Sequence, residues 1–178
     1  MQDILVVVDM QNDFVDGALG TAEAVAVVPR VVRRVEEAVR QGEAIYFTRD
    51  THQADYLSTL EGGKLPVSHC IQGSQGWEII PQLEAYSLNR PIVDKPVFGS
   101  TRLGELLQTA NTAEPIRQIT LIGLCTDICV ISNALLLKAY LPQVPIFVDA
   151  ACCAGVTPES HDIALTAMRA CQIDILNA

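Results

Sequence analysis

The residues from Ile4 to Val8 are all apolar, and the carboxylate of Asp9 follows them directly. A strand that is apolar at every position has both faces buried, which is typical of a parallel sheet covered by helices on both sides. A second stretch, containing Ile119, Leu121 and Ile122, has the same character. These runs favour an α/β fold built around a central parallel sheet.

Strand-like and helix-like segments alternate along the rest of the chain. We expect strands at residues 4–8, 44–48, 91–95, 118–124, 145–149 and 173–176. Apolar periodicity and capping residues indicate helices at residues 29–41, 77–83, 101–107, 129–141 and 158–171, with Pro29 as the first residue of its helix. The order predicts one domain over residues 1–178, a doubly wound, Rossmann-like sheet of six parallel strands with helices on both faces.

Composition restricts the partners and the compartment. The net charge is −9 with no long run of like charge, which argues against nucleic acid or an anionic membrane as the main partner. No apolar run approaches the roughly 18 residues of a membrane span. The N-terminus has no basic segment before its short apolar run, so we expect a cytoplasmic protein whose six cysteines are free thiols.

One cysteine, Cys129, lies where a strand should turn into a helix. Residues 123–130 follow the apolar stretch and precede a helical pattern, which places Cys129 in the first turn of that helix. There the helix dipole would lower the pKa of the thiol, and open α/β sheets bind ligands at this end of their strands. The position predicts a nucleophile. The alternative is that Cys129, like many cysteines near a helix start, only packs in the core.

Two charged residues end other predicted strands, Asp9 the first and Lys95 the third. The carboxyl ends of parallel strands share one edge of the sheet, so both side chains are expected near Cys129. A carboxylate can accept a thiol proton, and an ammonium group can stabilise the resulting anions. Taken singly, such an Asp is often a loop cap and such a Lys a surface charge, so the grouping carries the hypothesis.

The segment of residues 50–76 lacks periodicity and contains two of the three histidines. Long aperiodic segments in compact domains are usually either functional or disordered. Imidazole and carboxylate groups suit zinc, iron or manganese, so we predict a divalent metal site with the ligands Asp50, His52, Glu61 and His69. The alternative is that both histidines are ordinary surface residues of a loop. The third histidine, His161, is expected to be structural.

Signatures of several other enzyme classes are missing from the chain. There is no G-x-S-x-G segment, no G-x-G-x-x-G after the first strand and no Walker A loop. These absences disfavour a serine hydrolase, a dinucleotide enzyme and a nucleoside triphosphatase.

Three segments resemble, in order, the motifs of the isochorismatase-like cysteine hydrolases, the family that includes the nicotinamidases. They are Val8–Phe14, Lys95–Ser100 and Gly123–Val130, and the resemblance extends over nearly the whole chain. It implies a catalytic triad of Asp9, Lys95 and Cys129. It also implies a cis peptide between Leu124 and Cys125, and an oxyanion hole formed by the backbone N–H groups of Cys125 and Cys129.

The resemblance further implies how ligands bind. Asp50, His52 and His69 match the metal ligands of nicotinamidases, and Glu61 lies where some bacterial members supply a glutamate. Many members have another histidine soon after the D-x-H pair, and this chain has Tyr56-Leu57-Ser58 there instead. The resemblance implies a homo-oligomer, and the candidate substrate-binding residues are Gln11, Phe14, Trp77 and Leu124.

These motifs predict an amidohydrolase that forms a thioester, with nicotinamide as the expected substrate and nicotinate and ammonia as products. The metal, which we expect to be zinc, would bind the pyridine nitrogen and orient the ring. The alternatives within the family are an isochorismatase-type hydrolase or an amidase for carbamoyl or ureido substrates, neither of which needs a metal. A remote alternative is a non-catalytic, flavodoxin-like binding module.

Overall fold

The computed structural model describes residues 1–178 and contains one sheet of six parallel strands. The strands are β1 (Gln2–Val8), β2 (Ala44–Asp50), β3 (Ile92–Lys95), β4 (Ile116–Leu124), β5 (Ile146–Ala154) and β6 (Asp174–Leu176). Their order across the sheet is β3-β2-β1-β4-β5-β6, so the winding direction reverses between β1 and β4. The predicted doubly wound sheet is confirmed, and ligands of such sheets bind at this reversal point.

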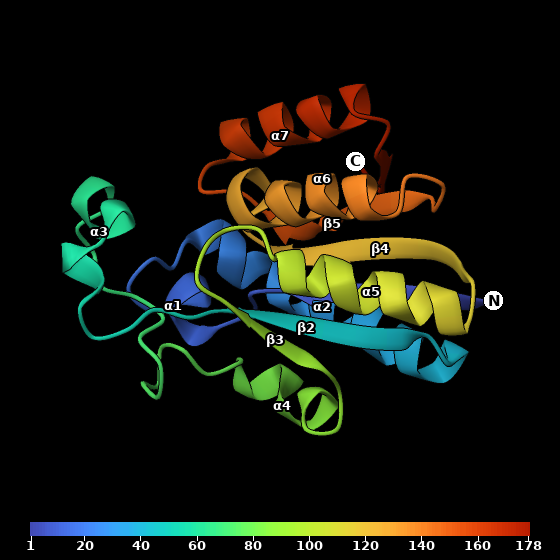
Figure 1. Ribbon diagram of the computed structural model, residues 1–178. Helices are drawn as coiled ribbons and strands as arrows, with labels where there is room; N and C mark the ends of the chain where they lie inside the picture. Colours follow the sequence, from blue (N-terminus) through green and yellow to red (C-terminus); the bar gives the residue numbers. More distant parts are fainter.

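Helices cover both faces of the sheet. One face carries α5 (Thr101–Ala113), α6 (Ile131–Tyr140) and α7 (Pro158–Ala170), and the other carries α2 (Ala22–Gln41) and α4 (Pro81–Ser87). The connections contain the short helices α1 (Asn12–Val15) and α3 (Leu60–Lys64), a 3₁₀ turn (Tyr56–Ser58) and a π-helical turn (Thr126–Val130). Figure 1 shows α5, α6 and α7 side by side, and α3 at the end of the molecule far from the N-terminus.

Strand β1 lies between two hydrophobic cores. Ile4, Val6 and Val8 belong to the core under α5–α7, whereas Leu5 and Val7 belong to the core under α2 and α4. All five side chains are fully buried. Because burial of each such side chain contributes roughly 1.5–3 kcal/mol, both faces of the strand have to be apolar.

Helix α2 begins earlier than the sequence predicts. Its first residue is Ala22, because the side chain of Thr21 accepts a hydrogen bond from the N–H of Ala24 and caps the helix. Pro29 therefore lies inside the helix and not at its start. Pro29 and Val25, four residues before it, are both exposed, so the carbonyl left without a helical partner lies on the solvent side. The predicted end of the helix at Gly42, with a φ of 72°, is confirmed.

The aperiodic segment after β2 leaves the sheet and returns beside its starting point. The N–H of His52 donates to the carbonyl of Cys70 (3.0 Å), and the N–H of Gln72 donates to the carbonyl of His52 (2.9 Å). Between His52 and Cys70 the chain forms the 3₁₀ turn and α3. The segment closes over the carboxyl end of the sheet, and the predicted helix at residues 77–83 is displaced to α4, which starts at Pro81.

None of the helices combines the length and the apolar character that crossing a membrane requires.

The contact between the ends of β1 and β4 generates a prediction about Gly123. This residue has a φ of 114°, and an added Cβ would lie 2.1 Å from the carbonyl oxygen of Val8. Gly123→Ala should lower the free energy of unfolding by about 2–6 kcal/mol, since backbone strain and overpacking each cost roughly 1–3 kcal/mol.

Urea unfolding followed by the fluorescence of Trp77 measures this loss. Gly63→Ala is the matched control, because Gly63 is exposed in α3 and an added Cβ there meets nothing within 4 Å. The control should be neutral or gain about 0.4–1 kcal/mol. Equal stability of the two variants would show that the close approach at Gly123 is not required.

Candidate active site

Four reactive side chains meet at the carboxyl ends of neighbouring strands. Asp9 follows β1, Asp50 and Lys95 end β2 and β3, and Cys129 lies in the π-helical turn after β4. None is more than 3% exposed. The parallel topology thus brings together Asp9, Lys95 and Cys129, the three residues proposed from the sequence as a catalytic group.

The ammonium group of Lys95 is the centre of this cluster. Its Nζ lies 2.6 Å from Asp9 Oδ2, 3.2 Å from Asp50 Oδ1 and 3.4 Å from Cys129 Sγ. Burial alone would lower the pKa of Lys95, but Asp9, Cys129 and Asp50 raise it above its ordinary value. The lysine therefore stays charged and cannot act as the base.

The two oxygens of the Asp9 carboxylate have different partners. The hydroxyl of Thr48 donates to Asp9 Oδ1 at 2.6 Å, whereas Oδ2 forms the ion pair with Lys95 and accepts no well-aligned hydrogen bond. Burial is the largest cause of the raised pKa of Asp9, and the second carboxylate of Asp50 adds to it against the effect of Lys95. A buried acid whose pKa is raised is suited to take up a proton.

Asp50 has the opposite tendency. Burial would raise the pKa of Asp50, but hydrogen bonds from His52 and His69 and the charge of Lys95 lower it well below its ordinary value. The pKa values of the two carboxylates beside Lys95 are thus shifted in opposite directions. Such a difference gives the two acids of a pair different roles. Asp9 is suited to proton transfer and Asp50 to permanent negative charge.

The thiol of Cys129 differs from the sequence prediction. Burial, followed by the charge of Asp9, raises its pKa well above the ordinary value, and Lys95 only partly offsets this. The expected lowering by a helix dipole was wrong, because Cys129 lies in the π-helical turn before α6 and is shielded from solvent. The resting group is a neutral thiol that needs a base. The peptide between Leu124 and Cys125 is cis, in line with the family resemblance.

The second predicted cluster also assembles. One ligand atom from each of its four members lies within 4.8 Å of the others, and the members are Asp50, His52, Glu61 and His69. The shortest contact joins His52 Nε2 to Asp50 Oδ2 at 3.0 Å, and His69 Nε2 lies 3.5 Å from the same oxygen. Two imidazoles and two carboxylates in a largely buried group form a donor set that fits a divalent metal.

His69 is oriented for this role by its other nitrogen. Its Nδ1 lies 2.8 Å from the carbonyl oxygen of Val67, which can only accept, so Nδ1 carries a hydrogen and Nε2 is the nitrogen that faces Asp50 and would bind a metal. The next residue, Cys70, donates its N–H to Asp13 Oδ2 at 2.7 Å. An added Cβ at Gly76 would lie 2.1 Å from Asp13 Oδ2. Glycine at this position therefore leaves room for Asp13 to accept the hydrogen bond from Cys70. Asp13 belongs to the first motif, but the sequence alone does not indicate this role.

Gln11 does not contact the pocket, contrary to its predicted role in substrate binding. It is fully buried, and its amide pairs with the backbone of Asp50: Nε2 donates to the carbonyl (2.8 Å) and Oε1 accepts from the N–H (2.7 Å). A second bond from Nε2 reaches the carbonyl of Trp77 at 2.9 Å. Gln11 thus fixes Asp50, whose two oxygens face Lys95 and the histidines.

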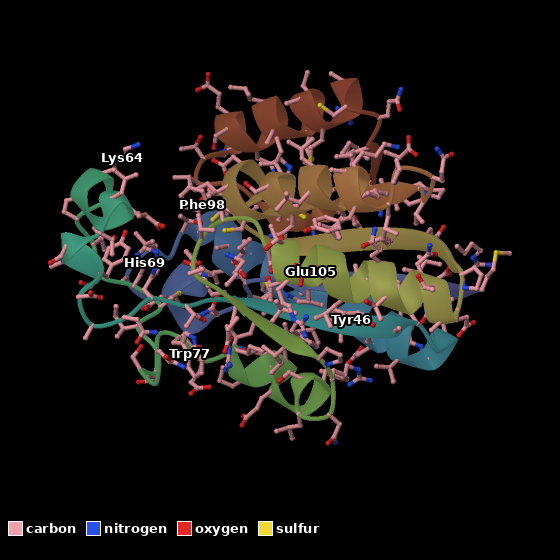
Figure 2. The ribbon with its side chains drawn as sticks, in the orientation of Figure 1. Tyr46, Lys64, His69, Trp77, Phe98 and Glu105 are labelled. Carbon is pink, nitrogen blue, oxygen red and sulfur yellow. The ribbon has the colours of Figure 1, made fainter.

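A small pocket of about 40 Å³ opens above the thiol. It is lined by Phe14, Leu19, Asp50, Glu61, Leu65, His69, Phe98, Cys125, Ile128 and Cys129. Phe98 and Leu65 are 40% and 38% exposed, so they form the solvent-facing rim of the pocket. Phe14 lines the pocket as the sequence predicts, and Figure 2 shows Phe98 and His69 at this end of the molecule.

Two other predicted substrate contacts lie elsewhere. Leu124 is fully buried in the core under α2. Trp77 packs under the guanidinium of Arg49, 3.5 Å from the ring centre, and donates its indole N–H to Thr51. Figure 2 places Trp77 away from Phe98. The pocket wall comes instead from Leu19, Leu65, Phe98 and Ile128, apolar residues whose sequence pattern gives no sign of this role.

A helix-covered parallel sheet whose carboxyl edge holds a buried cysteine, lysine and carboxylate is an α/β architecture with side chains suited to covalent hydrolysis. The chain belongs to the isochorismatase family, because the family model described as "Isochorismatase domain" matches residues 3–178. It is an enzyme of that family with the characteristics of an amidase.

Relatives and solved structures support this assignment. The nicotinamidase of Escherichia coli (strain K12) is 28% identical, over 90% of this chain and 86% of its own length. A pyrazinamidase of Pyrococcus horikoshii in complex with zinc has a TM-score of 0.83 at 25% identity and full coverage of both chains. An N-carbamoylsarcosine amidase from Thermoplasma acidophilum has a TM-score of 0.78 at 26% identity, covering 99% of this chain and 96% of its own.

The four-residue cluster predicts one divalent ion per chain. His69→Ala should weaken zinc binding by more than the roughly 10–100-fold that loss of an outer-shell partner costs, because it removes a ligand itself. Competition with a chromophoric chelator measures the affinity. His161→Ala is the control, since this histidine bonds to Thr126 and lies outside the cluster. Equal affinities of wild type and His69→Ala would remove His69 from the ligand set.

Proposed function

We propose that this enzyme hydrolyses nicotinamide to nicotinate and ammonia through a thioester on Cys129. The observation that carries the proposal is the buried contact of Cys129, Lys95 and Asp9 beneath a pocket whose wall includes members of the metal-binding cluster. A thiol alone does not select a ring amide, and a metal cluster alone does not cleave one. Their joint presence at one pocket favours a nicotinamidase over other members of the family.

The charge of the pocket supports a neutral substrate. Its lining includes Asp50 and Glu61 but neither an arginine nor a lysine, and the remaining residues are mostly apolar. Isochorismate and N-carbamoylsarcosine carry carboxylates, for which the lining offers no arginine or lysine as a partner. A flat, uncharged amide such as nicotinamide meets apolar walls formed by Phe14, Phe98 and Ile128.

In the first half of the reaction, Asp9 removes the proton of Cys129 and the thiolate attacks the amide carbon. The ammonium group of Lys95 stabilises the anion as it forms, because Nζ lies close to both Sγ and Asp9. The N–H groups of Cys125 and Cys129 hold the oxyanion of the tetrahedral intermediate. Asp9 then gives the proton to the departing ammonia, which leaves an acyl group on Sγ.

In the second half, Asp9 again acts as the base and takes a proton from the water that attacks the thioester. Collapse of the second tetrahedral intermediate releases nicotinate and returns the proton to the thiol. Thr48 keeps Asp9 in place through both steps, because it binds the oxygen that does not face Lys95.

The metal site serves orientation in this proposal. Asp50, His52, Glu61 and His69 would hold the ion, and zinc is our choice because the similar pyrazinamidase was crystallised with zinc. When bound, the ion supplies a Lewis-acidic contact for the pyridine nitrogen. Phe14, whose ring lies 5.6 Å from that of His69, would pack against the substrate ring.

The second candidate function is an amidase for a carbamoyl substrate, and the similarity to the N-carbamoylsarcosine amidase favours it. It would use the same Cys129 chemistry and no metal. The two candidates therefore differ in the effect of chelation and in the charge of the preferred substrate.

Ammonia release tests both candidates and the mechanism. Cys129→Ala should reduce turnover of nicotinamide by at least about a thousandfold, because loss of a covalent nucleophile removes the main route of catalysis. Cys171→Ala is the matched control, since this thiol is exposed at the end of α7 and should leave turnover unchanged.

Two results would contradict the proposal at different levels. Turnover of a carbamoyl amino acid but not of nicotinamide would replace the substrate and keep the family mechanism. Undiminished nicotinamide turnover by Cys129→Ala would eliminate the thioester.

A further inference from the structure

Asn133 is a buried polar residue that the mechanism does not use. It lies in α6, four residues after Cys129, and is fully buried. Its amide makes three hydrogen bonds: Nδ2 donates to the carbonyl oxygens of Cys129 (2.8 Å) and Phe98 (3.1 Å), and Oδ1 accepts from the N–H of Ser100 (3.0 Å). An amide side chain offers two donors and one acceptor group, so nearly all of its capacity is used.

These bonds join two parts of the active site that are distant in the sequence. Cys129 carries the nucleophilic thiol, and the ring of Phe98 lines the pocket from the loop between β3 and α5. The loop packs directly on α6, because an added Cβ at Gly99 would lie 2.6 Å from Leu136 Cδ1. The position of the loop is therefore set by α6, through Asn133 and this close contact.

The turn that carries Cys129 needs such support. It is a π-helical turn, in which the N–H of Val130 donates to the carbonyl of Cys125, and turns of this type occur mostly at functional sites. Asn133 binds the carbonyl of Cys129 itself from the following helix. Displacement of a reacting group by about 1 Å can cost on the order of a hundredfold in rate, so this bond bears directly on catalysis.

We propose that Asn133 is a positioning residue that holds the Phe98 wall of the pocket at a fixed distance from the Cys129 thiol. It acts through two backbone carbonyls and touches neither the substrate nor the reacting atoms. The ring of Phe98 forms part of the pocket wall, and the backbone that carries this ring is held by Asn133. This inference rests on the proposed amidase function, in which Cys129 attacks an amide bound against Phe98.

The first test compares steady-state constants for nicotinamide. Asn133→Ala should lower kcat by about tenfold or more, because the nucleophile turn loses its anchor, and raise KM several-fold, because the wall loosens. Asn111→Ala is the matched control. Asn111 also binds a backbone N–H, that of Ile116, but at the opposite end of the sheet, so its kcat and KM should stay within twofold of wild type.

A double-mutant cycle with Phe98→Ala separates positioning from a general loss of stability. In the Phe98→Ala background, Asn133→Ala should still lower kcat but should no longer raise KM, since the ring that it positions is gone. A KM effect of the same size in both backgrounds would overturn the link between Asn133 and the wall. Constants within twofold of wild type in folded Asn133→Ala would overturn the proposal as a whole.

Hydrogen exchange of the free enzyme supplies a readout that needs no substrate. The Ser100 amide should exchange at least tenfold faster in Asn133→Ala than in wild type or Asn111→Ala. Unchanged exchange would overturn the proposal even if the enzyme proved inactive on nicotinamide. If nicotinamide is not turned over but exchange responds as expected, only the proposed function fails.

A second variant covers the case in which Asn133→Ala does not fold. Asn133→Asp keeps an acceptor for Ser100 but cannot donate to both carbonyl oxygens. Its Ser100 amide should stay protected while kcat falls about tenfold or more. Wild-type kcat in Asn133→Asp would contradict the proposed role of the bond to Cys129.

Discussion

The rest of the active site depends on the ion pairs of the buried Lys95 ammonium group. Two carboxylates and a thiol surround it, out of contact with water. Isolated charges are very costly in such surroundings, so each member is stable only while the others are present. The strands β1, β2 and β3 each contribute one member at the carboxyl end, which makes the register of the parallel sheet a condition of the chemistry.

Much of this arrangement could be predicted from the sequence because it follows from topology. Apolar runs identify the central strands, and the residues at or just after the strand ends must lie at the common edge, which groups Asp9, Lys95 and Cys129. Roles set by contacts between distant segments could not be predicted. Gln11 and Asn133 each bind a backbone carbonyl more than 30 residues away, and Phe98 contributes a ring to the pocket wall. No local pattern shows these roles.

Two differences from expectation share a physical cause, namely that tertiary surroundings outweigh a local signal. A proline is a good first residue for a helix, yet the Thr21 cap and the exposed position of Pro29 allow the helix to begin earlier. A helix start lowers the pKa of a thiol in solvent, yet burial beside Asp9 raises the pKa of Cys129. Local rules describe what a residue favours alone, whereas the packed interior decides the outcome.

The paired bonds between His52 and the residues Cys70 and Gln72 bring the two ends of a long excursion side by side. A loop closed in this way can change length at little entropic cost, because the price of closure grows only slowly with the number of residues. The part that carries Glu61 and Leu65 can therefore vary independently of the sheet. Insertions and substitutions there would remodel the entrance and one metal ligand, while the strand ends keep the hydrolytic machinery intact.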